Sequence, residues 1–317
     1  MAKTFLASKP LSTTQGTLER LSRGAPASNR LRAFVRVHPL LAYFAITLVI
    51  SWVGVLLVVA LGPGRLPVTV EQFAPYRLFW GLAMVAGPTL SGLLMTGLVD
   101  GKAGLRDLLS RLVKWRVGAR WYAIALLSAP FALAVVLLPF SLASADFRPA
   151  IITTDAKVGL LLAGVGAGLM AGVFEELGWT GFAVPKLSAH HGVLATGLLL
   201  GIVWGTWHVL PFAAENGTPG GKLDLAIFLP NIAFFLAVLP AFRVLLVWFY
   251  SRTKSLLLTM VMHASLSATV SFILAPQVTG WALGGFYLTL AGLIWVVALV
   301  VAIINRGRLS TKSQDSR

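Results

Sequence analysis

Four ionisable side chains of this chain lie inside apolar stretches and are of the types that carry out hydrolysis. Glu175 and Glu176 are adjacent, and His208 and His263 lie in two later stretches. A single ionised carboxylate at the depth of a lipid bilayer is costly, and an adjacent carboxylate adds to that cost unless one of them is protonated or has a partner. Apolar residues would avoid this cost, so the pair of carboxylates predicts a functional role.

The spacing of these residues predicts that they converge. A short turn at residues 190–192 separates Glu175 from His208, and each lies about 16 residues from it, roughly 25 Å along antiparallel helices. His263 is expected about 13 Å inside a later helix. Ser267 follows it by one turn and shares its face. Three helices therefore offer polar groups at overlapping depths.

Two carboxylates and two imidazoles in a protein-lined cavity suit the hydrolysis of an amide. One glutamate can act as general base on a water molecule, and a histidine can polarise the carbonyl or stabilise the oxyanion. Alternatively, Glu175, His208 and His263 are candidate ligands of a zinc ion, with Glu176 as the base. The His-Glu-x-x-His motif of soluble zinc proteases is absent, so the spacing leaves both alternatives open.

The composition is that of an integral membrane protein. The 317 residues are 57% hydrophobic and 12% charged, with a mean hydropathy of +0.83. We expect an all-α polytopic membrane protein with about eight transmembrane helices. There is no cysteine, which excludes disulfides, and the polar, basic start of the chain is not a cleavable signal peptide. The eight expected spans are 39–61, 78–99, 121–143, 158–183, 193–213, 225–249, 255–275 and 282–304.

The basic residues predict the orientation of the chain rather than a nucleic-acid partner. With both ends cytoplasmic and eight spans, 20 Lys and Arg residues lie on the cytoplasmic side and 5 outside, with Arg243 inside a helix. We therefore predict a multi-pass protein of the cell membrane, N-in and C-in, whose basic residues contact anionic lipid headgroups.

The chain divides into one membrane domain and two tails. Residues 1–37 are expected to be a basic, disordered cytoplasmic tail, and residues 306–317 a short basic one. Residues 38–305 form the membrane domain, with the motifs in about 158–275. Within it, the leucines of 102–120 recur at helical spacing among basic residues, which predicts an amphipathic helix in the cytoplasmic interface; a short soluble linker helix is the alternative.

Two spans carry a small residue at every fourth position, which is typical of closely packed membrane helices. We expect Gly178 and Gly205 to narrow the space between these two helices beside the polar groups. The glycines are Gly164, Gly168 and Gly172 in one span and Gly197, Gly201 and Gly205 in the other.

Three short motifs resemble those of the CPBP family of intramembrane proteases, which contains CAAX prenyl proteases and bacteriocin-processing or immunity (ABI) proteins. The segment from Glu175 to Phe182 resembles the family motif Glu-Glu-x-x-x-Arg. Trp204 to His208 resembles Phe-x-x-x-His with tryptophan in place of phenylalanine, and His263 to Ser267 resembles His-x-x-x-Asn/Asp. The resemblance covers roughly residues 80–275.

This resemblance implies the roles of the residues. Glu175 would be the general base, His208 and His263 would position water or stabilise the oxyanion, and Glu176 would support them. Ser267 occupies the Asn/Asp position and keeps only a hydroxyl.

Thr180 occupies the arginine position of the first motif and removes a guanidinium that could neutralise Glu176. Arg243 could compensate for this loss, but the favoured interpretation is that its side chain extends to the cytoplasmic interface.

The sequence as a whole favours an intramembrane endopeptidase, of metallo- or glutamate type, that cleaves a membrane-associated or lipidated peptide or protein. Two other classes are alternatives. One is a catalytically impaired scaffold or immunity protein of the same fold, which the departures at Thr180 and Ser267 favour. The other is a proton-coupled transporter, because intramembrane glutamates and histidines also form proton relays, although no internal repeat is evident.

Overall fold

Long apolar helices make up most of the computed structural model, which describes residues 27–304. Eight of them are long and apolar enough to cross a membrane, and they coincide with the eight expected spans. The spans are α3 (Pro39–Leu61), α4 to α5 (Val70–Val99), α7 (Ala119–Ala143), α9 to α10 (Lys157–Ser188), α11 (Val193–Glu215), α12 to α13 (Leu225–Thr253), α14 with its extension (Leu256–Ile273) and α15 (Gly280–Ile304).

The outer surface of these helices is apolar, as the hydrocarbon of a bilayer requires. Leu57, Phe131 and Val158, on three different spans, are 55, 70 and 71% exposed. An exposed apolar belt of this kind is a liability in water and the normal surface of a protein in lipid. The chain is therefore an all-α, multi-pass integral membrane protein.

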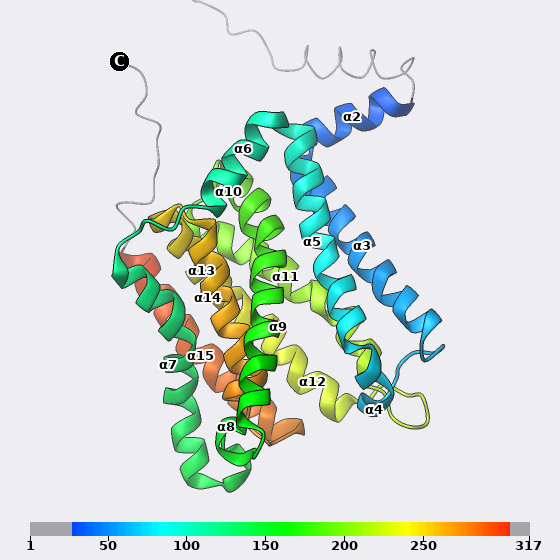
Figure 1. Ribbon diagram of the computed structural model, residues 1–317, viewed down its shortest axis with the longest axis vertical. Helices are drawn as coiled ribbons and strands as arrows, with labels where there is room; N and C mark the ends of the chain where they lie inside the picture. Colours follow the sequence, from blue (N-terminus) through cyan, green and yellow to red (C-terminus); the bar gives the residue numbers. More distant parts are fainter. Residues whose placement is uncertain (1–26, 305–317) are drawn as a thin grey trace, which may run out of the picture.

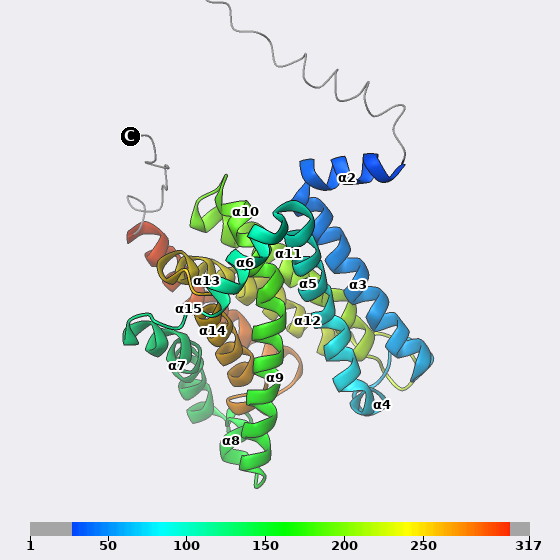
Figure 2. The same ribbon diagram turned by 45° about the horizontal axis from the view of Figure 1, so that its top comes forward.

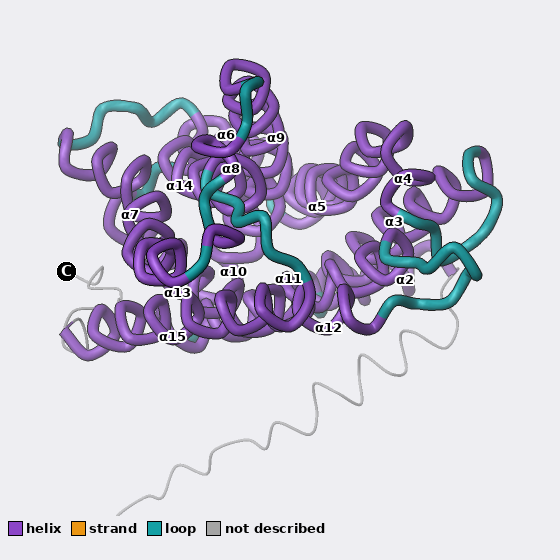
Figure 3. The backbone as a smooth tube through the Cα atoms, turned by 90° about the horizontal axis from the view of Figure 1, so that it is seen from below, coloured by secondary structure: helices purple, strands orange, loops and turns teal. Residues whose placement is uncertain are grey.

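The spans pack as neighbouring pairs around the centre of the bundle (Figures 1 and 2). Helix α9 (Lys157–Gly178) packs along α14 (Leu256–Ala268) and α5 (Arg77–Val99), while α11 packs along α13 (Leu239–Thr253). Seen from below, α3 and α5 lie on one side and α7 and α15 on the other, with α9, α11 and α14 between them (Figure 3).

The glycine stripes allow close helix packing, but not between the two helices that carry them. A β-carbon at Gly172 would meet the carbonyl oxygen of Met260 on α14, and one at Gly178 would meet the carbonyl oxygen of Pro88 on α5. A β-carbon at Gly205 would meet the carbonyl oxygen of Phe235. The expectation that Gly178 and Gly205 narrow a space between their own helices is therefore wrong. Two helices that follow one another in the sequence need not pack against each other through their glycine faces.

Three spans contain a π-helical segment, and each segment is followed within three residues by a proline. The segments are η3 (Trp179–Ala183), η4 (Phe234–Val238) and η5 (Thr269–Ile273). After η3 and η4 the proline lies inside the continuing helix, at the start of α10 and α13, where it has no N–H to donate to the preceding turn. In η4 the carbonyl of Ala237 accepts a hydrogen bond of 3.0 Å from the Trp295 indole. Such segments often occur at functional sites.

The expected amphipathic helix is present as α6 (Gly101–Leu112). Its Leu108 is buried against Leu256 and Met260, and Arg111 donates to the Tyr250 hydroxyl at 3.0 Å and to the Gly181 carbonyl at 3.1 Å. The Arg111 side chain therefore hydrogen-bonds to the π-helical segment η3 of the same protein. The position of α6 in a membrane interface stays a prediction.

Part of the expected disordered tail is helical. Residues 27–37 form α2 (Ala27–Val37), which lies across the end of the bundle at an angle to α3 (Figure 2). Its apolar and basic residues alternate with a helical period, and that periodicity favours a helix over a disordered segment. The expectations for residues 1–26 and 306–317 fall outside the described residues.

The remaining short elements either belong to an end of a span or lie in a loop between two spans. They are η1 (Ala74–Tyr76), η2 (Ala145–Phe147), α4 (Val70–Phe73), α8 (Ala150–Thr153), α10 (Val184–Ser188) and α12 (Leu225–Ala233). Helices α4 and α8 lie at the end of the bundle opposite α2, α6 and α10 (Figure 1).

Candidate active site

Glu176 lies at the centre of the bundle with its carboxylate fully enclosed. Its exposed fraction is 0%, and three side chains from three segments donate to its two oxygens. Arg243 Nη1 lies 2.8 and 2.9 Å from Oε1 and Oε2, and His263 Nδ1 lies 2.8 Å from Oε1. The Thr180 hydroxyl donates to Oε2 from the next turn of the helix. Glu176 is therefore a carboxylate whose hydrogen-bonding capacity is largely used.

Arg243 is the partner of Glu176 and does not extend to the interface. Its side chain is 0% exposed, so the favoured interpretation from sequence is wrong and the alternative, compensation, is correct. The physical reason is that a buried carboxylate without a counter-charge is far more costly than an ion pair. With Thr180 in the arginine position of the motif, the guanidinium comes instead from α13, 67 residues further along the chain.

Gly201 allows the side chain of Arg243 on α13 to reach Glu176. A β-carbon there would lie 2.5 Å from the Cα of Pro240 and 3.2 Å from the Cβ of Arg243. Both distances are too short, so only glycine lets α11 and α13 approach this closely. The glycine stripe of α11 thus sets the position of the arginine.

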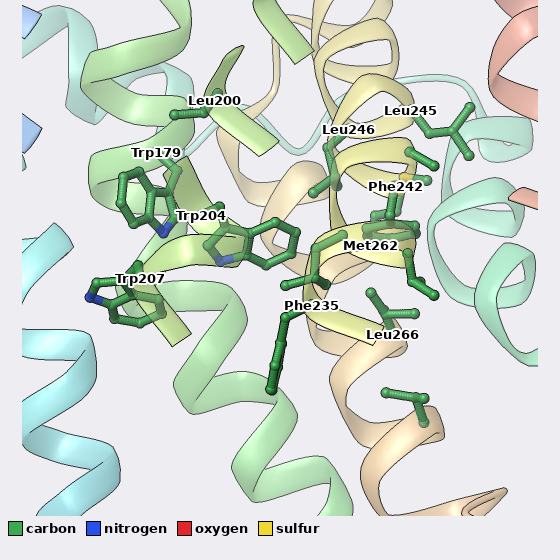
Figure 4. Close-up of a cluster of buried hydrophobic side chains, with 14 of the residues drawn as sticks. Trp179, Leu200, Trp204, Trp207, Phe235, Phe242, Leu245, Leu246, Met262 and Leu266 are labelled. Carbon is green, nitrogen blue, oxygen red and sulfur yellow. The ribbon is translucent and has the colours of Figure 1, made fainter. Parts of the chain in front are cut away.

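Trp204 connects the parts of the site. Its indole N–H donates to Glu175 Oε2 at 2.7 Å, and the guanidinium of Arg243 lies 4.1 Å from its ring centroid, which is cation–π geometry. The edge of the ring meets His263 at a centroid distance of 5.0 Å. The tryptophan is enclosed with Trp179, Trp207 and Phe235 around it (Figure 4).

Sequence reasoning noted Trp204 only as a substitute for the phenylalanine of the motif and assigned it no role. Phenylalanine has no N–H, so in this chain the tryptophan adds a hydrogen bond to Glu175 that the phenylalanine motif does not offer. The chemical difference between the two side chains was the signal that could have identified it.

The two imidazoles are oriented by hydrogen bonds of their Nδ1 atoms. His208 Nδ1 lies 2.8 Å from the carbonyl oxygen of Trp204, and its ring stacks on Phe235 at a centroid distance of 4.5 Å. A carbonyl only accepts, so His208 Nδ1 carries the proton. His263 likewise directs Nδ1 to the Glu176 carboxylate. Nε2 is therefore the atom that each neutral ring offers as an acceptor.

Four of the five expected site residues line one cavity of about 260 Å³. They are Glu175, His208, His263 and Ser267. Trp204, Phe235 and residues of η5 are among the other residues that line it. Glu176 does not line the cavity, but it hydrogen-bonds to His263, which does. The structure thus brings the three motifs together, as their depths predict, and distinguishes the two glutamates: Glu175 meets the cavity and Glu176 does not.

The arrangement does not fit a metal ion as it stands. In residues 27–304 no group of three or more His, Asp or Glu side chains is placed to hold one. His208 and His263 each keep an Nε2 acceptor and Glu175 keeps Oε1, so the atom types suit zinc, but three ligands have to lie within about 2 Å of one ion. We therefore derive no step through a metal.

The arrangement can hold and activate a water molecule. Glu175 has one oxygen fixed by Trp204 and lines a cavity whose other walls are mainly apolar, which is how a carboxylate general base is presented. The imidazoles beside it can accept from or, when protonated, donate to groups in the same cavity. The site therefore has a base and two polar partners for the oxygen atoms of a reacting amide.

Comparison with known proteins finds similarity in the part of the chain that contains these site residues. Residues 157–269 match the family model described as type II CAAX prenyl endopeptidase Rce1-like. CAAX prenyl protease 2 of Methanococcus maripaludis is 28% identical over 112 residues. This similarity covers 35% of the present chain and 41% of the relative, so the chain spans about two fifths of the relative's length.

The matched segment contains Glu175, His208 and His263, the residues that meet at the cavity. The resemblance to the CPBP family of intramembrane proteases, which the three motifs indicate, is thus confirmed over residues 157–269 of this membrane protein.

Proposed function

We propose that this chain is an intramembrane endopeptidase that hydrolyses a peptide bond of a membrane-associated or lipidated peptide or protein. One observation carries the proposal. Of two adjacent buried glutamates, Glu176 is held by Arg243 and His263, while Glu175 lies on the cavity wall with one oxygen held by an indole. This division is expected of a positioning carboxylate and a base.

In the proposed reaction Glu175 accepts a proton from a water molecule in the cavity. The water oxygen attacks the carbonyl carbon of the scissile amide, and the carbonyl oxygen becomes an oxyanion. Glu175 then gives its proton to the amide nitrogen, the C–N bond breaks, and the products are a carboxylic acid and an amine. Atoms and charges balance without a further reactant.

The histidines act on the oxygen atoms of this sequence. His208 accepts from the attacking water through Nε2, because Nδ1 is committed to the Trp204 carbonyl. His263, when protonated, donates Nε2–H to the oxyanion while Glu176 lies against Nδ1. Glu176 is thus a positioning residue that acts through His263, and Arg243 keeps that carboxylate in place.

The substrate class is inferred from where the cavity lies. A base inside the bundle reaches only a bond that can be drawn into the bundle, and the lipid-facing surface suits substrates that are already held in the membrane. The Rce1-like match supports a peptide with a lipidated end.

The test is cleavage of quenched peptides, with and without a farnesyl group, by the purified protein in lipid nanodiscs. Glu175→Ala and His263→Ala should each abolish turnover, because base and oxyanion partner act as a unit. Ser267→Ala should lose less, since a hydroxyl offers one modest hydrogen bond. Asp155→Asn, in an exposed loop, is the control and should retain wild-type rates.

Two outcomes would contradict the proposal. Wild-type turnover by Glu175→Ala would show that the base is elsewhere. A wild type that cleaves no peptide of a broad library, although correctly folded and inserted, would favour the scaffold alternative.

A further inference from the structure

A second, larger cavity adjoins the cavity that holds Glu175. Its volume is about 860 Å³, and it lies between α4, α5, α9, α11, α12 and η5. Ala167, Ser271 and Phe272 line both cavities. Its lining includes the first residues of α5 and the last of α11, at the end of the bundle where α4 and α12 lie (Figure 1). We call this larger cavity the outer chamber.

Besides Arg77 and Ser271, the polar residues that line the outer chamber are Glu215, Asn216 and Asn231, and each of these three offers a hydrogen-bond acceptor. The side-chain amide nitrogen of Asn216 donates to the Phe212 carbonyl at 2.6 Å, and that of Asn231 donates to the Ile227 carbonyl at 2.9 Å. Each amide therefore keeps its oxygen as an acceptor. Glu215, at the end of α11, adds a carboxylate to the same wall.

Glu215 is not explained by the stability of the fold. It lies at the C-terminus of α11, where the helix dipole disfavours a negative charge, and that last turn has no basic residue. Within residues 27–304 it forms no salt bridge. The exposed Arg77 lines the same chamber, and its positive charge acts on Glu215 through space. The two side chains form no salt bridge, so within the described residues Glu215 has a nearby cation but no bonded counter-charge.

We propose that the outer chamber binds a positively charged residue of the substrate, a lysine or arginine side chain, through Glu215, Asn216 and Asn231. An ammonium group has three donors and no acceptor, which matches one carboxylate and two amide oxygens. The proposal rests on the proposed function, because the bound segment has to continue into the cavity of Glu175.

The helix geometry gives the distance from the basic residue to the scissile bond. Glu215 follows His208 by seven residues on α11, or about 10 Å at about 1.5 Å per residue. An extended peptide spans about 3.4 Å per residue. The basic residue is therefore expected about three positions from the bond that is cleaved.

The chain has no cysteine, so the charge preference of the chamber is measurable without proteolysis. Ser271→Cys places one thiol where the two cavities meet. Its rates of reaction with a cationic methanethiosulfonate (trimethylammonium-ethyl) and an anionic one (sulfonato-ethyl) give a cation-to-anion ratio. We expect Glu215→Gln to lower this ratio by about tenfold, because removal of the carboxylate charge weakens both the attraction of the cationic reagent and the repulsion of the anionic one.

Glu71→Gln is the matched control, because Glu71 is an exposed carboxylate of α4 at the same end of the bundle and does not line the chamber. It should leave the ratio unchanged. A ratio that is the same in Glu215→Gln as in the parent protein, or one that falls equally in Glu71→Gln, would overturn the proposal.

A peptide pair tests substrate recognition. Two quenched peptides that differ only in lysine or norleucine at the third residue from the scissile bond should show a lysine preference in kcat/KM. Glu215→Gln should reduce that preference by about tenfold, and Glu215→Lys should invert it toward an aspartate peptide. An undiminished lysine preference in Glu215→Gln would refute recognition by this chamber, whereas failure to cleave either peptide would count against the proposed function and leave the thiol ratio as the test of the chamber.

Discussion

Replacing Arg243 by methionine tests whether the guanidinium from α13 takes the place of the one missing at Thr180. Arg243 and Glu176 are both 0% exposed, so the variant leaves a buried carboxylate with only His263 and Thr180 as donors. Removing one partner of a buried ion pair costs about 3–5 kcal/mol. Methionine keeps much of the arginine's apolar length, so this cost is mainly electrostatic.

The measurement is the free energy of unfolding in detergent, together with peptide turnover. We expect a loss of about 3–5 kcal/mol for Arg243→Met and a large loss of turnover, because His263 is oriented by the same carboxylate. Arg148→Met, at an exposed arginine outside the spans, is the control and should change stability by less than about 0.5 kcal/mol.

A second substitution that restores the guanidinium distinguishes loss of the ion pair from a general loss of packing. Thr180 lies one helical turn from Glu176 and already bonds to it, so Thr180→Arg in the Arg243→Met protein returns a guanidinium to the motif position. That double variant should recover part of both stability and turnover. The double variant Glu176→Gln/Arg243→Met should be more stable than Arg243→Met alone, because the uncompensated charge is gone. If the free energy of unfolding of Arg243→Met lies within about 1 kcal/mol of the wild-type value, the assigned role of Arg243 is refuted.

Three further predictions follow from the same geometry. Trp204→Phe restores the residue of the family motif but removes the N–H that holds Glu175; turnover should fall about tenfold or more with unfolding little changed, and an unaltered rate would remove Trp204 from the site. Because no three-ligand group is formed in the described part of the chain, turnover should persist in a strong zinc chelator, and a loss that added zinc reverses would establish a metalloprotease. Reporter fusions should map outside after residues 145, 215 and 278 and inside after 110 and 253, and an outside signal after 110 would overturn the orientation.

The orientation has a consequence for the proposed substrate. Helix α4, whose Val70 and Phe73 line the outer chamber, lies at the end of the bundle opposite α2 and α6 (Figure 1). If the termini are cytoplasmic, as the distribution of basic residues predicts, the chamber faces the other side of the membrane. Ser271→Cys in sealed, oriented vesicles, probed with the impermeant anionic reagent, measures this directly.

The elements of this protein could be predicted from the sequence because their signals are local. An apolar run long enough to cross a bilayer has few alternatives to a helix, and the structure has all eight expected spans. The depths of Glu175 and His208 follow from residue counts along helices of constant rise. Their meeting at one cavity could therefore be predicted, as could the existence of α6.

The partners of these side chains were decided by tertiary structure. Residue counts give the depth of a side chain along its helix but not the direction in which it points around the helix axis. They therefore did not show that Arg243 points inward to Glu176, 67 residues away, or that Glu175 accepts a hydrogen bond from the Trp204 indole. They also did not show that the stripe of α9 packs on α14. These features depend on which helix faces meet, and a face is selected by side-chain packing of the whole bundle, in which a buried charge strongly favours the arrangement that supplies its counter-charge.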